Sequence, residues 1–249
     1  MIVDVIPTLK ELTPQKIYGK TAIVLDIFRC TSTIVTALAN GCKEVVPQLS
    51  FQEVDTAAAK YPINDFLLAG EINGQKIPGW NLGNSPVEYT EYPVRDKTIL
   101  LTTTNGTNAI KACKPAKSVL IGSFLNLSAV CSRAVTDQKD IVIVCAGTQG
   151  NIALEDIMAA GCHISRLKKY YQDVRLTDLS RTFYYLYNYF RDNLFKVLSA
   201  SRSALNLQKL GYERDIAFCL QKNIYKIAPV LKNNTIQLNH PVLLSNDMF

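Results

Sequence analysis

The sequence has few of the features that mark a membrane protein, a secreted protein or a zinc protein. None of its apolar runs approaches the roughly 18 residues that a membrane-spanning helix needs, and the N-terminal segment has neither a basic leader nor a cleavage signature. The seven cysteines are scattered without a C-x-x-C pair, which argues for reduced thiols. With only His163 and His240, we do not expect a histidine-rich zinc site. These absences favour a cytoplasmic protein without a membrane partner.

Two common phosphate-binding signatures are also missing. Gly147 and Gly150 lack the full G-x-G-x-x-G pattern, and no acidic residue ends a following strand where a dinucleotide fold needs one. There is no G-x-x-x-x-G-K-[ST] segment, which excludes a P-loop. The net charge of +6 is mild. The densest run of basic residues is Arg166–Lys169, with Arg175 close behind. Such a run is typical of the solvated face of a helix, so we expect no nucleic-acid partner.

What the chain does have is an alternation of apolar strands and helices. Its 249 residues are 48% hydrophobic and 19% charged, which is ordinary for a globular protein. Short apolar runs such as Ala22–Ile27 and Asp140–Cys145 are typical of strands that are buried on both faces, and a helical pattern follows each. This alternation predicts a layered α/β/α fold around a mixed, largely parallel sheet. We expect a single domain over residues 1–249, with residues 1–95 and 96–249 as candidate halves of an internal duplication.

The C-terminal portion is expected to be mainly helical from Leu176. Aromatic residues and leucines recur at helical spacing from Phe183 to Leu194. Such aromatics could stack on bases, but the helical period favours a core-facing stripe. A helix is predicted over Ser203–Leu210. Three closing strands are predicted at Ile216–Leu220, Ile227–Val230 and Thr235–Leu238.

The most informative stretch is Ile99–Ile110, ILLTTTNGTNAI. An apolar strand runs into small hydroxyl, amide and glycine residues immediately before a helix. The free amides and the dipole of a helix start favour an oxyanion, so we predict phosphate binding here. An ordinary helix cap with a tight turn would use the same residues. The candidate phosphate ligands are Thr103, Thr104, Asn105, Gly106 and Thr107.

Acidic residues follow several of the other predicted strands, where ligands bind in open α/β sheets. Asp26, Glu71 and Asp156 are candidate ligands for Mg²⁺, which proteins often hold through one or two carboxylates and water. Asp26 and Glu71 are also candidate catalytic residues, together with Arg29, which could clamp an anion. Plainer interpretations exist, because Arg29 could form a structural ion pair with Asp26. Glu155 and Asp156 suit the first turn of a helix on dipole grounds alone.

Loops provide further candidates for binding a substrate. The segment Gln75–Ser85 is rich in glycine, proline and asparagine, and it is either a functional loop or a surface excursion. The remaining candidates for substrate binding are Asn84, Ser85, Ser123, Asn126 and Gly147, with Asp215 in second line.

Six segments carry a resemblance that covers nearly the whole chain in order. They are VLDIFRCTSTIVTALANG (Val24–Gly41), AGEINGQKIPGWNLGNSPVEY (Ala69–Tyr89), LLTTTNGTNAI (Leu100–Ile110), IGSFLN (Ile121–Asn126), CAGTQGNIALEDIMAAG (Cys145–Gly161) and LGYERDIAFC (Leu210–Cys219). Together they resemble the 2-phosphosulfolactate phosphatase family. The resemblance implies an α/β fold largely the family's own, dependence on Mg²⁺, and hydrolysis of phosphosulfolactate to sulfolactate and phosphate, a step of coenzyme M biosynthesis in methanogens.

Three positions depart from the pattern that the resemblance implies. An arginine is expected where Ile72 stands, an aspartate at Asn81 and an arginine at Asn151. The two missing arginines would remove charge-assisted contacts worth about 1.5–3 kcal/mol each.

Two hypotheses follow from the residues and the resemblance together. One is a Mg²⁺-dependent phosphomonoester hydrolase acting on a small phosphorylated acid, either directly or through an aspartyl-phosphate on Asp26. The other is a non-catalytic protein of the same descent that binds a phosphorylated ligand. A homo-oligomer is compatible with both hypotheses.

Overall fold

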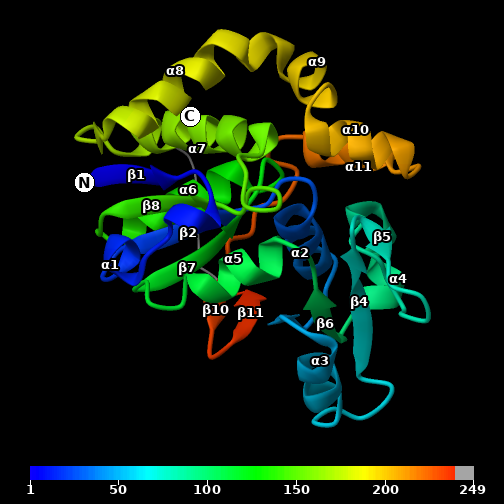
Figure 1. The fold of residues 1–249 in the computed structure, drawn as a ribbon. Coiled ribbons are helices and arrows are strands. Elements are labelled where there is room, and N and C mark those ends of the chain that lie inside the picture. The colour runs from blue at the N-terminus through cyan, green and yellow to red at the C-terminus, as the bar shows by residue number, and fades with distance from the viewer. Residues whose placement is uncertain (239–249) are drawn as a thin grey trace.

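The structure, a computed structural model, describes residues 1–238, so His240 lies outside the described residues. Its strands belong to one eleven-stranded sheet in the order β5-β4-β6-β3-β11-β10-β7-β2-β8-β1-β9 (Figure 1). The strands are β1 (Ile2–Ile6), β2 (Thr21–Leu25), β3 (Glu44–Gln48), β4 (Phe66–Ile72), β5 (Gln75–Lys76), β6 (Thr98–Thr102), β7 (Ser118–Gly122), β8 (Ile141–Cys145), β9 (Arg175–Leu176), β10 (Pro229–Lys232) and β11 (Thr235–Leu238).

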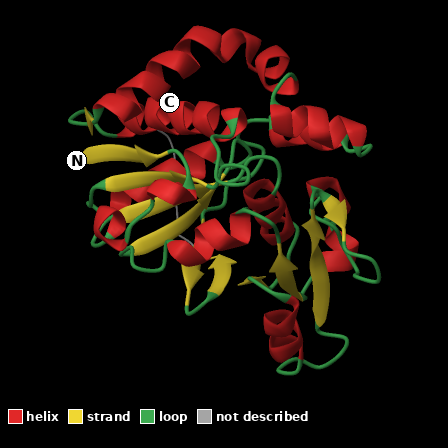
Figure 2. Ribbon diagram, in the orientation of Figure 1, coloured by secondary structure: helices red, strands yellow, loops and turns green. Residues whose placement is uncertain are grey.

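Helices connect most of these strands (Figure 2). The α-helices are α1 (Pro14–Ile17), α2 (Cys30–Ala39), α3 (Phe51–Ala58), α4 (Glu91–Val94), α5 (Gly106–Ala112), α6 (Leu127–Thr136), α7 (Leu154–Tyr170), α8 (Asp178–Phe190), α9 (Leu194–Ser199), α10 (Arg202–Lys209) and α11 (Glu213–Cys219). Among residues 1–238, no helix combines the length and the apolar character needed to cross a membrane.

The sheet consists of two parallel blocks that an antiparallel hairpin joins. In one block β6 pairs in parallel with both β3 and β4. In the other, β7, β2, β8, β1 and β9 are parallel neighbours. The hairpin β10–β11 lies between them, with β11 antiparallel to β3 and β10 antiparallel to β7. The mixed, largely parallel sheet expected from the sequence is therefore confirmed.

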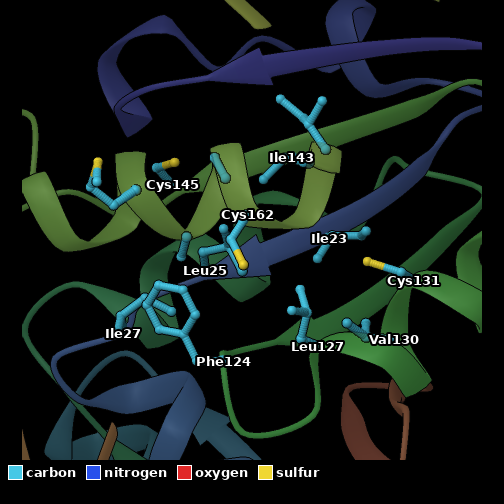
Figure 3. Packing of buried hydrophobic residues seen from close by; sticks show 14 of the residues in the cluster. Ile23, Leu25, Ile27, Phe124, Leu127, Val130, Cys131, Ile143, Cys145 and Cys162 are labelled. Atoms are coloured by element: carbon cyan, nitrogen blue, oxygen red, sulfur yellow. The ribbon is translucent and has the colours of Figure 1, made fainter. Parts of the chain in front are cut away.

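Alternate residues of the central strands face two different cores, which explains why these strands read as unbroken apolar runs. In β2, Ile23 and Leu25 contribute to one core, whereas Ala22 and Val24 contribute to the other. Helices α6, α7 and α8 cover the first core, where Leu127 and neighbouring side chains pack onto β2 (Figure 3). Helices α2 and α5 cover the second core. The layered α/β/α arrangement is confirmed.

The C-terminal portion is helical as expected, with one correction. The segment Ile216–Leu220, predicted as a closing strand, lies largely in helix α11. Only Ile216 and Cys219 of that helix's apolar residues are buried, which is helical spacing rather than alternation. The aromatic stripe also turns inward, because Phe183, Tyr187 and Leu194 are buried in the first core, so the core-facing interpretation is correct.

The candidate halves interleave within the sheet. Strand β6, from residues 96–249, pairs with β3 and β4 from residues 1–95. Strands β7 and β8 both flank β2. The two stretches of chain therefore build one common sheet.

Candidate functional site

A cavity of about 760 Å³ lies where loops after β2, β4, β6 and β8 meet helix α10. Its volume falls in the range usual for sites that bind small molecules. Residues from these loops and from α10 line it: Asp26, Phe28, Arg29, Glu71, Asn73, Gly74, Asn84, Thr104, Asn105, Thr148, Gln149, Ala200, Arg202, Ser203, Leu205, Asn206, Leu207 and Lys209.

Asp26 is a buried carboxyl at the end of β2. Its Oδ1 accepts a hydrogen bond from the amide of Cys30 at 3.2 Å, and Thr31 Oγ1 accepts from the Asp26 amide at 3.0 Å. Burial raises the pKa of Asp26 to about 7, with the charges of Glu71 and Glu155 adding to the shift. The short turn into α2 therefore holds a carboxyl that lines the cavity.

Glu71 joins the end of β4 to the turn after β6. Its Oε1 accepts a hydrogen bond from the Thr104 amide, and its Oε2 accepts from the Gly74 amide, both at 2.6 Å. The Thr104 hydroxyl donates to Oε2 at 3.1 Å. These bonds occupy both carboxylate oxygens, so Glu71 fixes two loops that line the cavity.

Arg29 is paired with Asp215, not with Asp26. Its Nη1 lies 2.7 Å from Asp215 Oδ2, and its Nη2 donates to the Gly74 carbonyl at 2.6 Å. The guanidinium stacks over the ring of Tyr212, 4.3 Å from its centroid. Ser85 donates to the other oxygen of Asp215 at 2.6 Å. The plainer interpretation of Arg29 as a partner of Asp26 is thus replaced by a longer network that holds Arg29 at the cavity.

Asp156 binds two loops together by their backbone. Its Oδ1 accepts from the Ile27 amide at 2.9 Å, and its Oδ2 accepts from the Gly147 amide at 3.0 Å. Burial raises the pKa of Asp156 well above its ordinary value, and the side chain is not among those lining the cavity. Asp156 and Gly147 therefore position the loops after β2 and β8.

The residues between β6 and the first turn of α5 form a hydrogen-bonded helix cap and also line the cavity. Thr103 and Thr107 bond each other, since the Thr107 amide donates to Thr103 Oγ1 at 3.1 Å and the Thr103 amide donates to Thr107 Oγ1 at 3.3 Å. Thr104 and Asn105 line the cavity, and Asn105 Oδ1 accepts from the Gln149 amide at 3.1 Å. A Cβ on Gly106 would lie 2.6 Å from Asp26 Oδ2, so only glycine lets α5 approach Asp26 this closely.

Two other candidate pairs lie in different surroundings. Ser123 and Asn126 bond each other, with Asn126 Oδ1 accepting from the Ser123 amide at 2.9 Å. Asn126 Nδ2 donates to the carbonyl of Ile121 at 3.0 Å, and neither side chain is among those lining the cavity. Asn84 lines the cavity, and its buried Oδ1 has no hydrogen-bond donor among residues 1–238. The loop that carries Asn84 and Ser85 therefore packs down onto the site.

The oxygen atoms of the cavity fit the divalent cation that the resemblance implies. Asp26 Oδ2 accepts no hydrogen bond within the described residues. Asn84 lines the same cavity, and its Oδ1 is buried without a donor among residues 1–238. Residues 1–238 hold no group of three or more His, Cys, Asp or Glu side chains that could bind a metal ion. A Mg²⁺ site needs only one or two carboxylates, with waters completing its shell. Asp26, Glu71 and Asn84 line one cavity and carry oxygen atoms of the kind that such a site uses.

The cations of helix α10 were missed by the sequence reasoning. Arg202 and Lys209 line the cavity, together with Ser203 and Asn206. Their only signal in the sequence is charge on an exposed helical pattern, which any solvated helix face shows.

The three positions that depart from the family pattern are all exposed, and none is among the residues that line the cavity. They are Ile72, Asn81 and Asn151.

Known proteins resemble this chain over most of its length. The model of the 2-phosphosulpholactate phosphatase family matches residues 7–234. A relative from Caldanaerobacter subterraneus subsp. tengcongensis is 40% identical over 237 residues, which cover 95% of this chain and 98% of that protein. A relative from Clostridium acetobutylicum is 39% identical over 240 residues, covering 95% and 100%. Both are named probable 2-phosphosulfolactate phosphatase. The chain belongs to the 2-phosphosulfolactate phosphatase family, a family of phosphoric monoester hydrolases.

Proposed function

We propose that the protein is a Mg²⁺-dependent phosphatase that hydrolyses a small phosphorylated acid, with phosphosulfolactate as the first substrate to test. One observation carries the proposal: the buried carboxyl of Asp26 lines a polar cavity of about 760 Å³, and its Oδ2 accepts no hydrogen bond from residues 1–238. Asn84 lines the same cavity, and its buried Oδ1 has no hydrogen-bond donor among residues 1–238. A site with such oxygens is suited to a hard cation and to the phosphate that the cation would hold.

Asp26 and Asn84 would hold the Mg²⁺, and Glu71 would keep the neighbouring loops in place. When bound, the ion would neutralise charge on the phosphoryl oxygens and lower the pKa of a coordinated water. The Thr104 and Asn105 side chains would orient the phosphate, and Arg29 would stabilise charge that develops on it.

In the hydrolysis itself, a water oxygen forms a bond to phosphorus while the bond from phosphorus to the ester oxygen breaks. The leaving oxygen takes up one proton of the attacking water, the other proton stays with the phosphate, and the products are the hydroxy acid and inorganic phosphate. The positioning network of Arg29, Asp215 and Ser85 serves this step because transferring phosphoryl groups depends mainly on alignment and charge stabilisation.

Phosphate release from phosphosulfolactate and 2-phospholactate, with Mg²⁺ and with excess chelator, tests the proposal. We expect release only with Mg²⁺. We expect Asp26→Asn to lose at least about a hundredfold in kcat. Asp55→Asn, an exposed carboxyl on α3, is the control and should match the wild type.

A different outcome would support the non-catalytic hypothesis. If the wild type releases no phosphate from either compound but 2-phospholactate raises its melting temperature, the chain is a binding protein. If Asp26→Asn retains full turnover, the assigned centre is wrong.

A further inference from the structure

Helix α10 is fixed across the cavity at both of its ends. Near its start, Ser203 Oγ lies 3.3 Å from the hydroxyl of Thr148, in the loop after β8. Near its end, the helix packs on the turn after β4, where a Cβ on Gly74 would lie 2.8 Å from Leu210 Cδ1 and 3.5 Å from Asn206 Nδ2. The helix therefore forms one wall of the cavity rather than a loosely attached cover.

The two cations of α10 stand at opposite ends of this wall. Arg202 is the first residue of the helix and Lys209 is the last, and both line the cavity. Within residues 1–238, neither side chain has a carboxylate within 4.0 Å or a hydrogen-bond acceptor. Their charges are therefore available to a ligand.

Arg29, the third cation that lines the cavity, already has hydrogen-bond partners. Its guanidinium is already bound to Asp215 and to the Gly74 carbonyl. If a ligand carries a second acid group, the cations still free to pair with that group are the two on α10.

The charges of the cavity are divided between two sides. The loops after β2 and β4 contribute the carboxylates of Asp26 and Glu71, and α10 contributes the two open cations. A phosphate held with a cation beside Asp26 would leave the rest of a small substrate directed across the cavity. An uncharged remainder would leave the α10 cations without partners, whereas a carboxylate or sulfonate would pair with them.

We propose that Arg202 and Lys209 determine specificity by binding the acid group that the substrate carries in addition to its phosphate. This inference rests on the proposed function, because it assigns the second end of the same substrate. Helix α10 then selects phosphorylated acids over phosphorylated alcohols of the same size.

A pair of substrates of similar shape tests the inference. 2-Phospholactate carries a carboxylate where isopropyl phosphate carries a methyl group. We expect Arg202→Gln and Lys209→Gln each to raise KM for 2-phospholactate by about tenfold or more, since each removes a charge-assisted bond. The KM for isopropyl phosphate should stay within about twofold of the wild-type value.

The controls are Arg181→Gln on α8 and Lys196→Gln on α9, which remove exposed cations that are not among the lining residues. They should change neither KM. Because Arg202 and Lys209 are themselves exposed, we expect all four variants to keep the wild-type melting temperature. An equal rise in both KM values, or no rise for 2-phospholactate, would overturn the inference while leaving the proposed hydrolysis intact.

Calorimetric titration with 3-sulfolactate, which has acid groups but no phosphate, distinguishes failure of the proposed hydrolysis from failure of the role inferred for α10. If the wild type hydrolyses neither phosphate ester yet binds 3-sulfolactate, and Arg202→Gln with Lys209→Gln abolishes that binding, α10 still selects the acid group. Unchanged binding by the double variant, or no binding by the wild type, would refute that role for α10.

Discussion

Asp215 and Arg29 form an ion pair at 2.7 Å although 186 positions separate them in the chain. Both side chains are almost fully buried, with 1% and 2% of their surfaces exposed. The pair joins α11 to the start of α2, and through Arg29 it reaches the cavity. A late helix thus sets the position of an arginine that belongs to the loop after β2.

Loss of this ion pair should lower the free energy of unfolding, because it leaves the buried charge of Arg29 without its carboxylate partner. We expect Asp215→Ala to lower the free energy of unfolding by about 3–5 kcal/mol and to raise KM for the phosphorylated substrate. Urea unfolding and steady-state kinetics measure the two effects. Glu91→Ala breaks the exposed pair of Glu91 with Arg95 and should cost less than about 1 kcal/mol. Equal losses in the two variants would contradict a special role for the buried pair.

Close approach of α5 to α2 should make Gly106 intolerant of a side chain. A Cβ there would lie 2.4 Å from Cys30 Cβ and 2.6 Å from Asp26 Oδ2, so Gly106→Ala should push the helices apart. We expect a loss of about 1–3 kcal/mol in stability together with a loss of turnover.

Gly79→Ala is the matched control for this substitution. Gly79 has a φ of +80° and no atom within 4 Å of an added Cβ, so it should cost only the left-handed backbone penalty of about 1–2 kcal/mol. Its turnover should be unchanged. Wild-type turnover in Gly106→Ala would show that the Asp26 carboxyl tolerates the displacement.

His163 should make the folded state sensitive to acid. Its ring is fully buried against Ala159, with Nδ1 2.7 Å from that carbonyl, and Nε2 has no partner among residues 1–238. Burial lowers the pKa of His163 from 6.5 to about 4. The unfolded chain therefore takes up this proton first, and stability falls as the pH drops from about 6.5 to about 4.

The size of this effect is at most about 3 kcal/mol, since one pKa unit corresponds to about 1.4 kcal/mol. Urea unfolding of the wild type and of His163→Gln across this pH range measures it. The wild-type free energy of unfolding should fall more steeply than that of the variant. Parallel curves would show that His163 titrates normally in the folded protein.

Local patterns predicted most of the elements but not all of their types. The continuous runs of β2 and β8 are apolar because both faces of these strands are buried, and such runs are recognisable in a sequence. Ile216–Leu220 was misassigned because a short apolar run suits a strand or a buried helix equally well. Only the packing of Ile216 and Cys219 in α11 distinguishes the two.

The residues around the cavity differ in how far the sequence could predict their places. Asp26, Glu71 and Thr104 were expected together because each follows a strand, and the structure brings them to one cavity. The roles of Ser123 and Asn126 in bonding each other could not be predicted, because cap residues and ligand residues share the same chemistry. Arg202 and Lys209 reach the cavity through long-range packing of α10, which leaves no local pattern.

The hairpin β10–β11 follows the other described strands in the chain, and this order affects how the sheet can form during synthesis. It occupies residues 229–238, yet it fills the gap between β3 and β7 in the middle of the sheet. On the ribosome, both parallel blocks therefore have an open edge at their shared boundary until residues 229–238 have emerged. Such edges can pair with other chains, so the nascent protein is exposed to misassembly at this boundary until β10 and β11 are in place.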